Sequence, residues 1–255
     1  MAPRGVKTLL RTTAPAKLVG EGKFKGYQSK ETNRKCRGLT KQLQSRLWSE
    51  GILPTIARMG DTSIRPKKAW KGKKGGQTRG KLVDQQLTKL VNGGKAMIMR
   101  QKKMYALTRL ALRGLAKRGL DPVIAQRSVL CEDRRLATAA DVIAYERKTN
   151  RLVVVELKCG YDHGRKAAAE RAGRPCKMKA PCSRVLDCNV NRHLAQLAVT
   201  RDLLSRERQT LRSLNDLGVE STIGGMLMYV NDEGVEYFKL DEWWVKKAPA
   251  LVRML

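Results

Sequence analysis

The residues best suited to catalysis, by side-chain chemistry and position, are Asp141, Glu156 and Lys158, which lie at the two ends of a segment with two apolar, strand-like runs. Side chains alternate along a strand, so Glu156 and Lys158 should point to the same face. Two acids beside a cation are costly to bury unless they pair or bind a metal. Carboxylate oxygens are the ligands that Mg²⁺ prefers, and a fixed cation nearby could offset negative charge that develops on phosphorus.

A β-hairpin is the element that would bring these side chains together. Residues 141–145 and 152–158 are rich in β-branched residues and flank a polar segment, which predicts two strands joined by a tight turn. With the turn centred in that segment, Asp141 lies opposite Glu156 or Leu157, and directly opposed Cβ atoms are roughly 5 Å apart. The alternative without a catalytic role is an edge strand with a surface Glu–Lys pair.

This arrangement resembles the PD-(D/E)xK nuclease superfamily, with Asp141 as the first acid and Glu156-Leu157-Lys158 as the ExK. The resemblance implies that the two carboxylates and the Leu157 carbonyl hold one or two Mg²⁺ or Mn²⁺ ions. It also implies that Lys158 orients or polarises the attacking water. Many relatives have G-x-x-D before the hairpin, whereas Thr138 stands at the glycine here.

Further residues extend the resemblance to the RecB-like and viral alkaline exonuclease branch. Asp84 follows Gly80 at the place where relatives have a metal-proximal histidine, so it is either a metal ligand or a surface Asp. Gln196, on a helix after the ExK, matches a glutamine that faces the active site in relatives and could bond water or phosphate. Relatives often carry a further Glu on the preceding strand, and the nearest residues to that place here are Gln126 and Glu132.

The charge of the chain points to a polyanionic partner. The 255 residues carry a net charge of +30 with a sequence pI of about 10.4, which favours DNA, with RNA as the alternative. Hydrophobic residues make up 42%, enough for a sizeable core. We expect no membrane partner, because no apolar run approaches the roughly 20 residues that span a bilayer.

Positive charge is densest at the start of the chain. Residues 1–80 hold 20 Lys and Arg against 4 Asp and Glu, and residues 1–77 are predicted to form a largely extended, nucleic-acid-binding arm. A solvated linker or a nuclear-localisation signal would look similar, and the acid-poor first 20 residues also resemble a mitochondrial transit peptide. An intracellular location, in a nucleus or a virion, is favoured over a mitochondrion. The candidate phosphate and base contacts are Arg65, Lys67, Lys68, Trp70, Lys71, Lys73 and Lys74.

A polar segment over residues 162–190 is expected to be a long loop that could clamp DNA, with Tyr161, Arg165 and Lys166 as contacts. Three cysteines follow one another in or beside it, namely Cys176, Cys182 and Cys188. Their spacing is not the CxxC of zinc knuckles, so zinc is disfavoured and reduced thiols are the default.

Apolar periodicity supplies the surrounding elements. Helices are expected from about residue 78 to 91, from 95 to 118 and from 191 to 204, a strand over 122–131, and a closing hairpin over 224–240. The predicted fold is therefore α/β: a restriction-endonuclease-like core over residues 78–255, with a mixed central β-sheet flanked by helices, preceded by the basic arm.

These observations predict a metal-dependent nuclease that hydrolyses DNA phosphodiester bonds in replication, recombination or repair, in a cellular or viral setting. A catalytically silent protein with the nuclease fold, acting in genome packaging or in a ribonucleoprotein, is the competing reading of the same charge. A nuclease specific for DNA junctions differs only in substrate geometry. Exonuclease and endonuclease action, and the oligomeric state, stay open.

Overall fold

The structure is a computed structural model that describes residues 1–19, 26–48, 75–93, 104–159, 177–231 and 234–255. Its strands form one mixed, eight-stranded sheet in the order β1-β2-β3-β5-β6-β7-β8, with β4 paired to β5. The strands are β1 (Ala16–Val19), β2 (Gly26–Ser29), β3 (Lys35–Gly38), β4 (Leu120–Cys131), β5 (Leu136–Glu146), β6 (Arg151–Lys158), β7 (Glu220–Asn231) and β8 (Gly234–Lys239).

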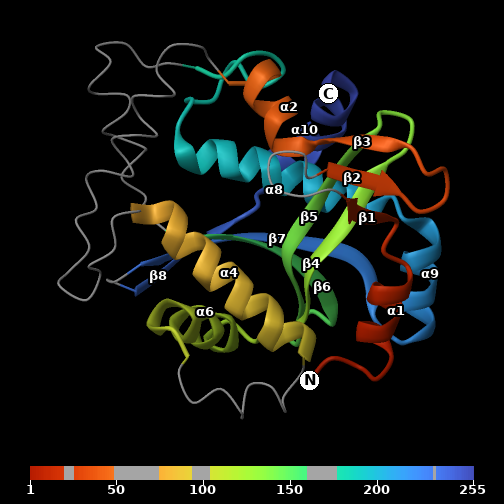
Figure 1. Ribbon diagram of the computed structural model, residues 1–255, viewed down its shortest axis with the longest axis vertical. Coiled ribbons are helices and arrows are strands. Elements are labelled where there is room, and N and C mark those ends of the chain that lie inside the picture. Colours follow the sequence, from red (N-terminus) through yellow and green to blue (C-terminus); the bar gives the residue numbers. More distant parts are fainter. Residues whose placement is uncertain (20–25, 49–74, 94–103, 160–176, 232–233) are drawn as a thin grey trace.

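Helices cover both faces of this sheet (Figure 1). The described helices are α1 (Val6–Thr12), α2 (Leu39–Arg46), α4 (Gly75–Gly93), α6 (Ala106–Lys117), α8 (Asn189–Ser205), α9 (Arg208–Asp216) and α10 (Glu242–Met254). The mixed α/β architecture predicted from the sequence is confirmed at this level. None of these helices is long and apolar enough to cross a lipid bilayer.

The centre of the sheet is the antiparallel set β4, β5 and β6, followed by β7 parallel to β6 and β8 antiparallel to β7. The β5–β6 hairpin is the one expected from residues 141–158. Val142 pairs with Val155 and Glu146 with Arg151, which is one of the two registers predicted from the turn. The register follows from alternation, because a slip by one residue would move every apolar side chain of β6 to the opposite face.

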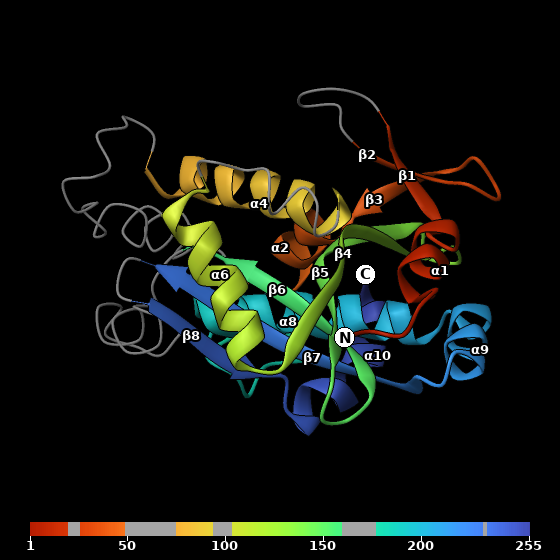
Figure 2. The same cartoon turned by 90° about the horizontal axis from the view of Figure 1, so that it is seen from below.

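One face of the sheet is covered by α4 and α6. Val83, Leu87 and Leu115 pack against Val153 and Val155, the odd-numbered valines of β6. Figures 1 and 2 show the two helices side by side on this face. The sequence placed the second of these helices over 95–118; its described part runs only from Ala106 to Lys117.

The other face is covered mainly by α8 and α10 (Figure 2), and α1 and α2 contribute buried residues to the same core. Here Leu152 and Val154, the even-numbered apolar residues of β6, pack with Leu197 and Trp244. All four are buried. Residues of β6 on both faces are buried, which explains its run of apolar residues, since the strand is sandwiched between two helical layers.

The start of the chain differs from the extended arm predicted for residues 1–77. In its described parts, residues 1–19 and 26–48 form α1, α2 and the strands β1, β2 and β3, and β3 pairs with β5 in parallel. Leu10 and Leu43 are fully buried in the main core. The charge of this stretch sits on exposed positions of folded elements, so the extended arm was wrong for residues 1–19 and 26–38.

Arg127 fastens this N-terminal segment to the sheet. Its guanidinium is fully buried and donates to the carbonyl of Leu10 at 2.9 Å and to the hydroxyl of Thr13 at 3.1 Å. Both nitrogens of the fork also reach Glu207, at 2.7 and 3.0 Å. A buried charge is tolerated only when it is paired and fully hydrogen-bonded, as it is here.

Candidate functional site

Asp141 lies where the sheet divides. On the same edge of β5, β3 pairs only with Leu136 and Ala137, and pairing with β6 begins at Val142. The side chain of Asp141 sits in the resulting gap, where its Oδ2 accepts a hydrogen bond from the backbone N–H of Leu157 at 2.9 Å. The first acid and the ExK strand are therefore in direct contact, as the predicted hairpin requires.

Glu156 is the most deeply buried member of the site. Its side chain is fully buried at the end of β6, and its Oε1 accepts from Gln196 on α8 at 2.7 Å and from the ammonium group of Lys158. Its Oε2 is buried with no hydrogen-bond partner among the described residues. Burying a carboxylate oxygen without a partner costs about 1–3 kcal/mol or more, and a cation bound at this oxygen would offset that cost.

Asp84 and Gln126 extend the cluster on the α4 side. Gln126 stands opposite Asp141 in the β4–β5 register and has a positive φ of 54°. Its amide donates to Oδ1 of Asp84 at 2.8 Å and to Oδ1 of Asp141 at 3.2 Å. An amide thus bridges two carboxylates. Glu132 lies elsewhere, accepting a hydrogen bond from Thr32 at 3.3 Å, so it is not the third acid.

The electrostatics of the cluster favour a bound cation. Burial, then the charge of Asp141, raises the pKa of Glu156 to about 7, against the opposing effect of Lys158. Burial, then Asp141, also raises the pKa of Asp84. Burial alone would lower the pKa of Lys158, but the Glu156 and Asp141 carboxylates outweigh it and raise this pKa. Lys158 therefore stays protonated. It is one positive charge beside the three carboxyl groups of Asp84, Asp141 and Glu156.

The ligand set for a metal is small. Among the described residues, no group of three or more His, Cys, Asp or Glu side chains has the geometry to hold an ion. Asp141 and Glu156 with the Leu157 carbonyl are the hard oxygen donors that suit Mg²⁺ or Mn²⁺. The partnerless Oε2 of Glu156 fits such an ion, and Asp84 reaches this set through Gln126.

Two further side chains border the site that the sequence did not indicate. His193 lies one turn before Gln196 on α8, and its Nδ1 is 2.6 Å from the hydroxyl of Tyr229, which pairs with Lys158 across β6 and β7. Burial, then Lys158, holds the pKa of His193 well below its ordinary value. The three-residue spacing from Gln196 was the available signal. Tyr27 of β2 lies near Asp141, whose charge adds to burial in raising its pKa.

Most of the remaining predicted contacts lie outside the described residues. Cys182 and Cys188 are buried, and Cys176 lies outside the described residues. Also outside the described residues are the predicted nucleic-acid contacts Arg65, Lys67, Lys68, Trp70, Lys71, Lys73, Lys74, Tyr161, Arg165 and Lys166.

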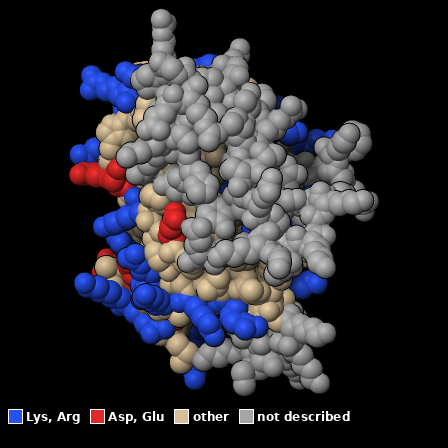
Figure 3. Space-filling view, turned by 90° about the vertical axis from the view of Figure 1, so that its left-hand side faces the viewer, with Lys and Arg blue, Asp and Glu red and all other residues tan. Residues whose placement is uncertain are grey.

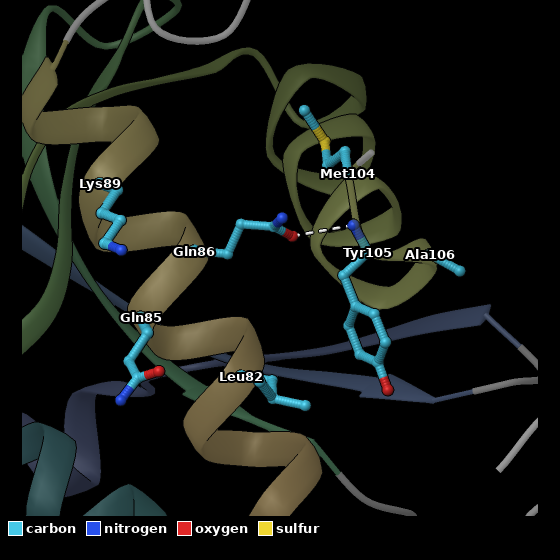
Figure 4. A pocket seen from close by; sticks show the side chains of 7 residues that line it. All are labelled: Leu82, Gln85, Gln86, Lys89, Met104, Tyr105 and Ala106. Carbon is cyan, nitrogen blue, oxygen red and sulfur yellow. Dashed lines mark hydrogen bonds between the residues drawn. The ribbon is translucent and has the colours of Figure 1, made fainter. Parts of the chain in front are cut away.

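Among the described residues, one cavity borders the site and another borders α4. A cavity of about 270 Å³ extends from Gln126 and Tyr27 past Arg11. A larger one, of about 550 Å³, lies between α4 and the start of α6 (Figure 4). There the Oε1 of Gln86 accepts from the backbone N–H of Tyr105 at 2.8 Å. Neither Asp84 nor any other carboxylate of the site lines the larger cavity.

No protein-family model matches the chain, and no curated protein is similar enough to count as a match.

Proposed function

We propose that this protein is a metal-dependent nuclease that hydrolyses DNA phosphodiester bonds, on a restriction-endonuclease-like arrangement of the sheet. The observation that carries the proposal is the buried carboxylate of Glu156, whose Oε2 has no partner among the described residues while Asp141 and Lys158 converge beside it. A protein without a use for this cluster would gain stability by replacing it with apolar side chains.

The proposed chemistry assigns one task to each residue. Asp141, Glu156 and the Leu157 carbonyl hold Mg²⁺ or Mn²⁺, which would supply an activated water and stabilise charge on phosphorus. Hydrogen bonds fix both carboxylates: the N–H of Leu157 orients Asp141, and Gln196 orients Glu156. Such orientation of the ligands by neighbouring donors sets the geometry of the site before substrate binds.

Lys158 places a permanent positive charge next to the metal ligands. Its ammonium is paired with Glu156, and its raised pKa keeps it protonated at neutral pH. From this position it can donate to the attacking water or to a phosphate oxygen, and a preorganised donor of this kind typically contributes about 10²–10³-fold in rate. Gln196 shares the same carboxylate oxygen and limits the motion of the pair.

The net charge of +30 supports a nucleic-acid substrate, and it equally supports a silent, structural nucleic-acid-binding protein. The two functions differ in what the cluster does. A scaffold would bind DNA through its surface charges whether or not Lys158 and Asp141 are intact, whereas a nuclease would lose cleavage and keep binding.

The experiment is cleavage of end-labelled linear DNA and of closed circular DNA in Mg²⁺, Mn²⁺ or EDTA. Wild-type protein is compared with Lys158→Ala, Asp141→Asn and, as a control outside the site, Lys246→Ala on α10. Metal-dependent cleavage that both site variants lose by about 10²-fold or more supports the proposal. Nicked circles would identify an endonuclease and loss of linear DNA alone an exonuclease. Salt-sensitive binding without cleavage in any metal would instead establish the scaffold.

A further inference from the structure

One exposed row of cations runs along α6. Arg109, Arg113 and Lys117 follow one another at intervals of four residues and are all exposed, while Leu107 and Leu115 on the opposite side are buried against the sheet. Four residues of helix rise about 6 Å, so the row extends over about 12 Å on a rigid support. We call these three side chains the α6 row.

The α6 row has no acidic partner among the described residues. α6 contains no Asp or Glu, and none of the three side chains forms an ion pair within the described part of the chain; Arg109 donates to the Met104 carbonyl. Elsewhere arginines do have such partners, as in the Arg127–Glu207 pair. Like charges four residues apart on a helix repel one another and destabilise it, and a bound anion would offset that repulsion.

The exposed positions of α6 also lack aromatic side chains. Besides the row, the exposed residues of this helix are Ala106 and Ala116. Proteins that bind single strands combine cations with aromatic rings on which the bases stack. A row of cations without rings offers charge for phosphates and no surface on which bases stack, which suits a duplex, whose bases are stacked inside.

The α6 row lies on the same layer as part of the candidate site. α6 packs beside α4, which carries Asp84, and both helices cover the same face of the sheet (Figure 2). In Figure 3, Lys and Arg side chains form a band across the lower part of the face, at the height of α6 in Figure 1. A duplex held along this helix would pass the α4 side of the carboxylate cluster.

We propose that the α6 row binds the phosphate backbone of double-stranded DNA and holds the duplex beside the Asp141 cluster. The proposal rests on the proposed function for its ligand, since it names the surface through which that substrate is held. The binding measurement below needs no cleavage, so the two proposals fail separately.

The chain contains a matched control for this test. Arg208 and Arg212 on α9 are also exposed, also four residues apart, and lie on the opposite side of the molecule from α6 in Figures 1 and 2. The double variants Arg109→Gln/Arg113→Gln and Arg208→Gln/Arg212→Gln therefore remove the same charge from the same kind of position. Thermal unfolding of both checks that each is folded.

Binding of a short blunt duplex and of a single strand of equal length is measured in EDTA over a range of salt. For the duplex, the α6 double variant should lower the slope of log affinity against log salt by about two, which is about tenfold in affinity over a fourfold range of salt. The α9 double variant should keep the wild-type slope. Single-strand binding should change by less than duplex binding in the α6 double variant.

Equal losses in the α6 and α9 double variants would overturn the proposal, because net charge alone would then explain the binding. Equal losses for duplex and single strand would overturn the assignment to a duplex. If the wild type never cleaves DNA in Mg²⁺ or Mn²⁺ but the α6 effect is found, the nuclease proposal fails and the α6 row stands as a DNA-binding surface. If the wild type cleaves DNA but the α6 double variant binds the duplex as the wild type does, the α6 proposal fails and the nuclease proposal stands.

Discussion

The buried carboxylate of Glu156 should make the metal-free protein less stable as the pH rises. Its pKa is raised from an ordinary 4.5 to about 7 in the folded protein, chiefly by burial. A carboxyl whose pKa is raised on folding contributes stability that is complete below its unfolded pKa and is lost as the pH rises through its folded pKa. At about 1.4 kcal/mol for each pKa unit, the loss by about pH 8 should approach ~3 kcal/mol.

The assay is denaturant unfolding in EDTA at a series of pH values, for the wild type and for Glu156→Gln. His193 acts in the opposite direction, because its lowered pKa makes stability rise with pH up to its ordinary value of 6.5. His193 is present in both proteins, so the difference between them isolates Glu156. In the wild type Lys158 stays charged throughout this window, because the Glu156 and Asp141 carboxylates raise its pKa. We expect the wild type to lose ~3 kcal/mol relative to the variant between about pH 4.5 and 8.

Mg²⁺ or Mn²⁺ should restore this stability at pH 8 in the wild type and not in Glu156→Gln. Below the pKa of about 7, protons compete for the carboxylate, so the apparent metal affinity should fall about tenfold per pH unit. The reasoning is refuted if the free-energy difference between the two proteins is independent of pH. It is equally refuted if the metal stabilises the variant as well as the wild type.

The remaining predictions concern the frame that holds the site. Glu207→Gln should cost about 3–5 kcal/mol in the free energy of unfolding, because it leaves the buried guanidinium of Arg127 without its counter-charge; a loss below about 1 kcal/mol would contradict this. Hydrogen bonds from Arg147 hold the pKa of Asp121 at about 2. As the pH falls from about 4 to 2, the free energy of unfolding should therefore drop by about 1 kcal/mol, a value discounted for the exposure of the arginine. Titration of Asp121 by NMR measures this pKa. Gly225→Ala should cost about 1–3 kcal/mol, measured by thermal unfolding, because the added methyl would lie 2.8 Å from a leucine side chain.

The sequence by itself predicted the β5–β6 hairpin and narrowed its register to two, one of which the structure shows. Alternating apolar residues and a short polar turn are local features, so the pairing of Val142 with Val155 could be predicted without knowledge of the rest of the fold. The family resemblance, and not the spacing, implied that Gln196 faces the site, where its amide donates to Glu156. The hairpin prediction rests on periodicity over a few neighbouring residues, which the chain carries in its own order.

The tertiary structure alone decided what residues 1–19 and 26–38 do and how the site is completed. Strands of four residues, such as Lys35–Gly38, show no period of their own and form because β5 offers a free edge far away in the sequence. Asp84 and Asp141 meet through Gln126, whose positive φ and bridging amide have no sequence signature. The physical reason is that such contacts take their stability from groups distant along the chain, so the residues that make them look like ordinary basic or polar surface until the chain is folded.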